Sequence, residues 1–300
     1  MSISRAFRNA RLAHTLNFLD AKTIEESVDT SGNTGDIIYD NNFVYIKTTD
    51  GWKRASISSF ATPSDISGLQ LWLDASDATT LYDATIGGSL VTADGAVKRW
   101  EDKSGNDRHA TEATNSPVRK AAEQNGLDAL FFDGINDGLG IQYNIVGLNE
   151  ITIFAVAKNA GTLDDTPIFF GNYGSTGGAG GLFVQLGVND TAVAVGGRPT
   201  NKGDAYNTAQ SGSESLDFTV ATGIVSNGNV SARTNGTSLA TYNASAGNLV
   251  GESVLEIGRI PAFSLFYKVY LAEIIVYNFA LSDTDREAVE NYLMSKWGIS

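Results

Sequence analysis

The sequence predicts an all-β protein: an antiparallel β-sandwich with a single α-helix at its C-terminal end. Glycine accounts for 32 of 300 residues, or about 11% against a usual ~7%, which favours many turns over long helices. Between residues 69 and 277, short runs of β-branched and aromatic residues alternate with Gly, Asn, Asp and Ser, as is typical of antiparallel sheets. The length allows one large domain or two smaller ones.

Residues 1–60 are predicted to form a small unit of their own. Residues 2–22 place hydrophobic residues near helical spacing among several arginines, which fits either a short amphipathic helix or an extended arm. Residues 36–58 hold two β-rich runs flanking Asn41-Asn42 and a further turn at Asp50-Gly51, which predicts a three-stranded meander. So small a unit has little core, so we expect it to pack on the main domain, a symmetry mate or a partner protein. Residues 61–65 are predicted to be a linker.

Residues 66–300 are predicted to form the sandwich. Its expected strands are 69–75, 129–133, 150–158, 167–171, 181–187, 191–196, 217–225, 254–258 and 266–278. A helix should follow, because Ser282 suits an N-cap, with an acidic residue three positions later, and Gly298 suits its end. Ala288, Tyr292 and Leu293 are expected to form the apolar stripe that packs on one edge or end of the sandwich.

Charge and composition exclude several classes of function. The net charge is −13, and all of it lies in residues 61–300 because residues 1–60 carry seven basic and seven acidic residues. Such a body repels phosphate backbones and anionic lipids, so we expect no nucleic-acid partner. No apolar run is long enough for membrane insertion, and no secretory signal pattern is found. With no cysteine, disulfides, cysteine-based metal sites and thiol catalysis are excluded.

Five segments occur in an order that resembles a known module. They are LQLWLDASD (69–77), VKRWEDKSGNDRHA (97–110), LFFDGINDGL (130–139), EITIFAVAK (150–158) and LAEIIVYNFALSDTDREAVENYLMSKWGI (271–299). Together they resemble the laminin-G-like, concanavalin-A-like jelly-roll module found in extracellular and phage virion proteins. Residues 35–55 are similar to a short β-motif near the base of phage fibre and head-decoration proteins.

The resemblance implies a non-enzymatic virion structural protein, a head-decoration or fibre component that displays the jelly roll outward, either as decoration alone or to bind host-surface glycans. Residues 1–60 would attach it to other virion proteins of the capsid, neck or tail, with Arg5, Phe7, Arg8 and Arg11 as the assembly contact. A second copy of the chain is a further expected partner, and assembly in the host cytoplasm would place the protein in the virion. The alternative is a secreted or surface carbohydrate-binding lectin, which would normally need a signal peptide.

Two kinds of binding residue are candidates. Trp72 and Tyr173 offer aromatic rings on which a sugar could stack, although core packing is the simpler interpretation of such aromatics. The resemblance also implies Ca²⁺ bound by loop oxygens. The acidic loop residues are Asp74, Asp77, Asp133 and Asp137, and the competing interpretation is that they form Asx turns in Gly-rich loops.

An enzymatic function is not expected. Glucanases of this superfamily carry a Glu-x-Asp-x-Glu strand whose alternation puts carboxylates on one face, and this spacing does not occur here. Ser104, Asp107 and His109 fall within one stretch, whereas hydrolase triads usually draw on separate elements. A glycan hydrolase is therefore the least favoured of the three functions.

Overall fold

The computed structural model describes residues 25–27, 33–39, 43–56, 62–162, 168–172, 181–188, 191–197, 207–211, 215–242 and 248–300. The chain divides into two compact units, Met1–Ser59 and Phe60–Ser300. Arg5, Phe7, Arg8 and Arg11 lie outside the described residues, as does the expected helix or arm at 2–22.

The N-terminal unit is a small antiparallel sheet. Its strands are β1 (Glu25–Ser27), β2 (Ile37–Tyr39), β3 (Phe43–Thr48) and β4 (Gly51–Ser56), in the order β1-β4-β3-β2. The three predicted strands of the meander are present. The sequence-based prediction missed β1, whose three residues, Glu-Glu-Ser, give no hydrophobic signal. This strand pairs with the outer edge of β4.

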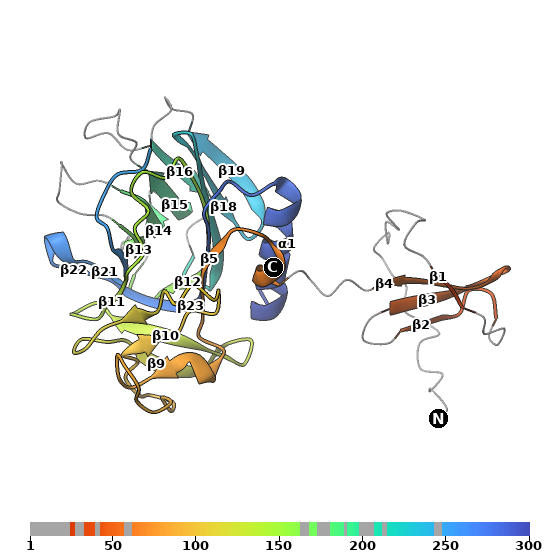
Figure 1. Ribbon diagram of the computed structural model, residues 1–300, viewed down its shortest axis with the longest axis horizontal. Coiled ribbons are helices and arrows are strands. Elements are labelled where there is room, and N and C mark those ends of the chain that lie inside the picture. Colours follow the sequence, from red (N-terminus) through yellow and green to blue (C-terminus); the bar gives the residue numbers. More distant parts are fainter. Residues whose placement is uncertain are drawn as a thin grey trace. The chain divides into compact units, whose positions relative to one another are not determined.

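The larger unit is an antiparallel β-sandwich with one C-terminal helix, as predicted (Figure 1). Within the described residues it consists of an eight-stranded sheet, a nine-stranded sheet and a short hairpin. The eight-stranded sheet runs β19 (Thr237–Tyr242), β18 (Asn229–Thr234), β17 (Thr219–Ser226), β12 (Glu150–Asn159), β23 (Lys268–Tyr277), β10 (Leu127–Asp133) and β9 (Val118–Gln124), and β5 (Leu69–Asp74) also pairs with β23. The nine-stranded sheet runs β16 (Asn207–Ser211), β15 (Thr191–Gly197), β14 (Phe183–Val188), β13 (Ile168–Gly171), β20 (Leu255–Ile257), β11 (Leu139–Ile141), β8 (Ala110–Thr111), β7 (Arg99–Trp100) and β6 (Leu81–Tyr82). The hairpin is β21 (Arg259–Ile260) with β22 (Leu265–Phe266), and the 3₁₀ turns are η2 (Pro63–Asp65), η3 (Ala78–Thr80) and η4 (Pro261–Phe263).

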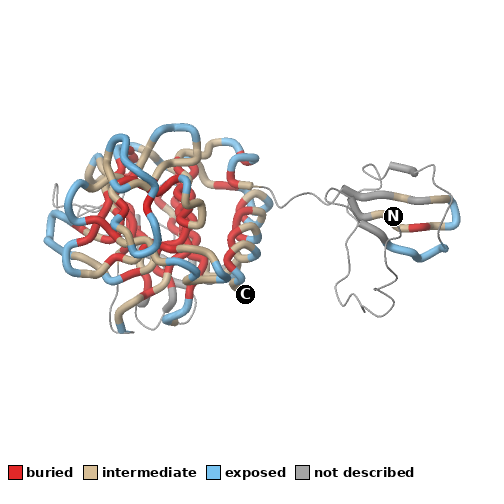
Figure 2. The backbone as a smooth tube through the Cα atoms, turned by 90° about the horizontal axis from the view of Figure 1, so that it is seen from below, coloured by how far each residue is buried: buried red, intermediate tan, exposed pale blue. Residues whose placement is uncertain are grey.

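Strand β12 shows why the eight-stranded sheet is apolar on both faces. Successive side chains of a strand point to opposite faces. Ile151 and Ile153 therefore enter the core between the two sheets, whereas Phe154 and Val156 face a second hydrophobic cluster that includes the helix. A strand covered on both sides becomes a continuous hydrophobic run, which explains the EITIFAVAK segment. Buried backbone follows these strands and one side of the helix in Figure 2.

Helix α1 (Asp283–Trp297) begins and ends where the sequence predicts. The Ser282 hydroxyl accepts a hydrogen bond from the Asp285 amide at 3.2 Å, and Gly298 adopts the left-handed conformation of a C-cap at φ +62°. The predicted stripe needs correction. Leu293 is fully buried, but Ala288 and Tyr292 are only partly buried. The face toward the sheet is formed by Arg286, Val289, Glu290, Leu293 and Trp297. It includes two charged residues, which a search for an apolar stripe passes over.

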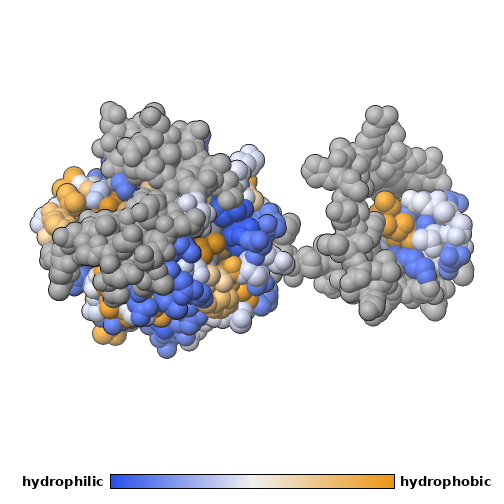
Figure 3. Space-filling view, turned by 90° about the horizontal axis from the view of Figure 1, so that it is seen from above, coloured by the Kyte–Doolittle hydropathy of each residue, from blue (hydrophilic) through white to orange (hydrophobic). Residues whose placement is uncertain are grey.

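Two surface observations complete the fold. No helix in the described part of the chain has the length and hydropathy needed to cross a bilayer. The described surface in the view of Figure 3 mixes hydrophobic with hydrophilic patches. Hydropathy alone therefore does not single out a binding site on that face, and candidate sites have to be located from contacts and cavities.

Candidate functional site

A β-bulge in β23 positions a buried carboxylate against the helix. Val156 of β12 pairs with Glu273, but the next residue of β12, Ala157, pairs with Leu271, so Ala272 is an extra residue in β23. A bulge of this kind re-aims the neighbouring side chains. It places Glu273 on the helix-covered face of the sheet, directly opposite Asp74 of β5.

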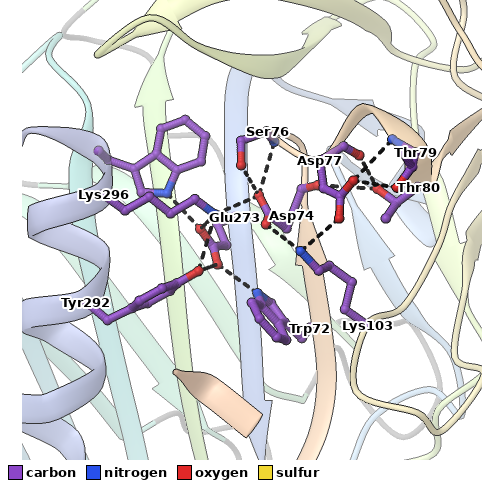
Figure 4. Close-up of polar contacts among 11 residues, drawn as sticks. Trp72, Asp74, Ser76, Asp77, Thr79, Thr80, Lys103, Glu273, Tyr292 and Lys296 are labelled. Atoms are coloured by element: carbon purple, nitrogen blue, oxygen red, sulfur yellow. Dashed lines mark hydrogen bonds and ion pairs between the residues drawn. The ribbon is translucent and has the colours of Figure 1, made fainter. Parts of the chain in front are cut away.

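Glu273 is fully buried and accepts a complete set of hydrogen bonds (Figure 4). Its Oε1 accepts from Trp72 Nε1 at 2.7 Å and from the Tyr292 hydroxyl at 3.1 Å. Its Oε2 accepts from Lys296 Nζ and Trp297 Nε1, both at 2.7 Å. Three of these four donors come from α1, so this carboxylate ties the end of the helix to the sheet.

Lysine side chains neutralise the two facing carboxylates. Lys296 Nζ bridges them, at 2.8 Å from Asp74 Oδ1 and 2.7 Å from Glu273 Oε2. Lys103 Nζ lies 2.9 Å from Asp74 Oδ2 and 3.0 Å from Asp77 Oδ2. Burial alone would raise the pKa of Asp74, but Lys296 and Lys103 lower it below its ordinary value. Burial and the Asp74 charge raise the pKa of Glu273, against the effect of Lys296.

The contacts of Asp74 and Glu273 form one polar cluster, and this cluster stabilises the fold. Buried carboxylates are stable only when paired and hydrogen-bonded, and here both oxygens of Asp74 and of Glu273 contact cationic or N–H donors. A substrate would have to displace the helix to reach Glu273. The sequence-based search missed Glu273 and Lys296. The available signal was a single acidic residue inside the otherwise apolar run VYLAEIIVY, because a charge buried in a core requires a partner.

Trp72 lies in this cluster. Besides its bond to Glu273, its ring makes an edge contact with Tyr292 at 6.4 Å between centroids. Lys103 Nζ lies over the ring, 4.6 Å from its centroid. One face of the indole is thus covered by a lysine, and stacking of a sugar on Trp72 stays a prediction. Tyr173 lies outside the described residues.

Asp133 and Asp137 form a separate turn after β10. Asp133 Oδ1 accepts from the amides of Ile135 and Asn136, and Asp137 Oδ2 accepts from the Asp133 amide at 3.0 Å, which is Asx-turn geometry. Burial and the Asp133 carboxylate raise the pKa of Asp137 to about 6. In the described part of the chain, no three metal-ligating side chains gather into a group. The four predicted acids therefore do not form one cluster, and calcium binding stays a prediction.

An open groove lies on the outer face of the eight-stranded sheet. Its volume is about 440 Å³, and the lining includes aromatic rings and two lysines. The lining residues are Phe131, Lys158, Asn159, Ala160, Gly161, Leu216, Lys268 and Tyr270. This volume falls within the roughly 300–1,000 Å³ of small-molecule sites.

The groove is built from one row of side chains across three strands. Phe131 of β10 pairs with Tyr270 of β23, which pairs on its other side with Lys158 of β12. Directly paired residues share one face of a sheet, so the three side chains stand side by side. The Phe131 and Tyr270 rings lie 4.9 Å apart, and Phe218 lies 6.1 Å from Tyr270. The sequence-based search missed this site, because the row appears only once the register of three distant strands is known.

Comparisons with known proteins show the fold. A search of protein-family models finds no match, and a search of curated protein sequences finds none either. Among solved structures, the chain is similar to the receptor-binding domain of botulinum neurotoxin type G, with 11% identity, a TM-score of 0.51 and coverage of 76% of this chain and 52% of that one. It is also similar to Trypanosoma rangeli sialidase in complex with a difluoro-KDN sugar, with 14% identity, a TM-score of 0.50 and coverage of 87% and 44%.

A third similar structure has nearly the same extent as the sandwich. Domain 4 of AbnA, a GH43 extracellular arabinanase from Geobacillus stearothermophilus, in complex with arabinotriose, matches with 14% identity, a TM-score of 0.51 and coverage of 74% of this chain and 97% of that one. The chain spans about half the length of the toxin and sialidase structures it matches. At these identities the likeness shows a shared β-sandwich fold.

Proposed function

We propose that this protein is a non-enzymatic glycan-binding component of a virion, a head-decoration or fibre protein whose β-sandwich binds host-surface glycans in the groove beside Tyr270. The observation that carries the glycan-binding part is the row of Phe131, Tyr270 and Lys158 along that groove. Aromatic rings give a sugar an apolar surface, and neighbouring polar groups fix its orientation.

The fold is compatible with this role. The arabinanase domain of similar extent is described in complex with arabinotriose, and the toxin domain is named for receptor binding. A β-sandwich of this size therefore accommodates a saccharide. In the present chain Phe131, Lys158, Lys268 and Tyr270 of the groove lie on paired strands, and a pre-organised surface reduces the cost of ordering it on binding.

The arrangement of carboxylates favours binding over hydrolysis. Glycosidases need two carboxyl groups that flank the scissile bond and reach the substrate. The facing pair here is Asp74 and Glu273, and both are buried against lysines and the helix. Among the residues that the structure describes, the groove lining contains no acidic side chain. Hydrolysis is therefore the least favoured function.

The virion part of the proposal is supported by the sequence resemblance and by the division into two units. A small unit, residues 1–59, precedes a sandwich with its own core, which suits an attachment segment that carries a display domain. A secreted or surface lectin with the same groove is the alternative. Mass spectrometry or cryo-EM of purified particles separates the two, because a lectin would be absent from them.

Glycan binding is tested with a glycan array and titration calorimetry on the full chain. We expect binding by the wild type, at least a tenfold loss in Tyr270→Ala, and retained binding in Phe263→Ala, a partly exposed aromatic of η4 outside the groove lining. Circular dichroism checks that both variants are folded. Failure of the wild type to bind any glycan, or full binding by Tyr270→Ala, would contradict the proposal.

A further inference from the structure

We infer that the groove selects acidic saccharides, binding a sugar carboxylate through Lys158 and Lys268 while the sugar ring packs on Tyr270. The inference rests on the proposed glycan binding and adds the charge of the ligand. Both lysines line the groove, together with Tyr270. Both lie next to Tyr270, because Lys158 of β12 is its cross-strand partner and Lys268 lies two residues before it on β23.

Lys158 is held at the groove by the aromatic rings. Its Nζ lies 5.3 Å from the centroid of Tyr270 and 5.5 Å from that of Phe218. An ammonium group over aromatic faces gains cation–π attraction, so the charge has a preferred position before any ligand binds. A fixed cation beside an apolar ring matches a ligand that carries an anionic group next to a hydrophobic ring face.

Three other lysines of the sandwich differ from these two in their partners. Lys103, Lys120 and Lys296 form ion pairs with carboxylates at 2.6–3.0 Å, whereas within the described residues Lys158 and Lys268 form none. Asp133 is the residue paired with Lys268 across the sheet, but its Oδ1 is taken by two backbone amides of its own turn. In a chain of net charge −13, two ammonium groups at one groove that form no ion pair with a described residue favour an anionic ligand.

The other charges near Tyr270 do not cancel the preference of the groove for an anionic ligand. Glu123 and Lys120 affect its phenol with opposite signs, and burial is the larger cause of its raised pKa. Sulfated sugars would satisfy the same ammonium groups. We commit to a carboxylate because two lysines next to one ring can each contact an oxygen of a carboxylate that lies beside that ring. The sulfated sugar becomes a separate arm of the test.

The test measures the affinity of the full chain for matched saccharides by titration calorimetry. The pairs are sialyllactose against lactose, a glucuronic-acid disaccharide against its glucose counterpart, and 3-O-sulfated lactose. We expect at least one carboxylated sugar to bind about tenfold tighter than its neutral counterpart, since hydrogen bonds to charged groups are stronger than neutral ones. Lys158→Met and Lys268→Met should each remove most of that difference in affinity between the acidic and the neutral sugar.

Lys98→Met is the matched control, because Lys98 precedes β7 of the other sheet and is not in the groove lining. It should bind the acidic sugar as the wild type does. Equal affinity for acidic and neutral sugars, or wild-type affinity in both lysine variants, would overturn the charge selectivity and leave glycan binding standing. Preference for the sulfated sugar alone would overturn the carboxylate assignment. Binding of no saccharide would remove the proposed function as well.

Discussion

Asp137 shows how one buried carboxyl group makes stability depend on pH. Burial and Asp133 raise its pKa to about 6 from an ordinary 3.8. The folded state therefore holds the proton more tightly than the unfolded chain does. Ionisation at neutral pH costs folding free energy, and that cost is relieved as the pH falls through about 6 toward 3.8.

Asp137→Asn should therefore stabilise the sandwich at pH 7.5. The amide stays neutral and keeps an oxygen for the Asp133 amide, so we expect a gain of about 1–2 kcal/mol and a Tm rise of about 2–6 °C. We expect the Tm of the wild type to rise between pH 7 and pH 5, and this rise should shrink in the variant. Thermal unfolding across that range measures both effects. Asp83→Asn, at an exposed position, is the control, and a lower Tm for Asp137→Asn at pH 7.5 would contradict the argument.

The calcium prediction now depends on the same turn. Asp74 and Asp77 already have ammonium groups against their oxygens, so a calcium effect should come from Asp133 and Asp137. Saturation at 100 times Kd would stabilise the fold by about 2.7 kcal/mol. The measurement is a melting curve in millimolar Ca²⁺ against EDTA, and Asp133→Ala should abolish the shift. Identical wild-type curves in the two conditions would leave these residues as turn formers.

Substitution of Glu273 should lower the free energy of unfolding more than substitution of any other described carboxylate. Glu273→Ala leaves the indole N–H groups of Trp72 and Trp297 and the Tyr292 hydroxyl without this acceptor. It also removes one of the two carboxylates that Lys296 bridges. We expect a loss of about 3–5 kcal/mol, the cost of breaking a buried charge pair. Glu273→Gln keeps an acceptor oxygen and the shape, and it should lose less.

Urea unfolding measures this difference, with Glu287→Ala on the exposed face of α1 as control. The control should lose under about 1 kcal/mol, as for other surface ion pairs. If Glu273→Ala lost no more free energy of unfolding than the control, the Glu273 contacts would not stabilise the packing of the helix on the sheet.

At the scale of elements, α1 is attached to the sheet at two places. Near its C-terminal end, Lys296 and Trp297 reach Glu273. In its middle, the buried Glu290 pairs with Arg233 of β18 at 2.8 Å, and Arg286 lies 3.7 Å from the same carboxylate. Two separate attachments fix both the position and the rotation of the helix, so α1 covers part of the outer sheet face and leaves the groove at the other part open.

Trp297→Ala tests the contribution of the helix. Trp297 is fully buried and bonded to Glu273, and removal of a core tryptophan costs about 3–5 kcal/mol. The Tm should fall by several degrees or more. Ser295→Ala, on the exposed side of the same helix, should leave it unchanged. A shift of less than about one degree in Trp297→Ala would mean that the helix is peripheral to stability.

The elements also show what the sequence can and cannot predict. Strands β5 and β12 and the helix caps were predictable, because alternation, a continuous hydrophobic run and capping residues are local patterns. Strands β18 and β19 were missed because their residues are largely polar. A local signal did exist: Asn227-Gly228 and Asn235-Gly236, both with positive φ, are typical two-residue hairpin turns. The groove and the Glu273 cluster depend on the pairing of strands distant in sequence, which no local pattern specifies.

At the scale of the whole molecule, the two units should be separable. Phe60–Ser300 contains both sheets, the helix and the two hydrophobic clusters of the sandwich. Deletion of residues 1–60 should leave a folded domain with a β-rich far-ultraviolet circular dichroism spectrum and the same melting transition. The truncated chain should no longer join its assembly, which co-purification with particles measures. Normal incorporation of the truncated chain would assign attachment to the sandwich instead.

The extra residue in β23 has a consequence for how the sheet is put together. On one side β23 pairs with β12 along its length. On the other side it is shared by two strands placed end to end, with β10 beside Lys268–Leu271 and β5 beside Glu273–Tyr277. The bulge at Ala272 falls at the junction. Side chains alternate between the two faces of the sheet both before and after the bulge, but the extra residue shifts this alternation by one position. β10 and β5 therefore each pair with a segment of β23 that has its own side-chain alternation. The groove lies on one side of the bulge and the polar cluster on the other, so the two can vary in sequence independently although they share β23.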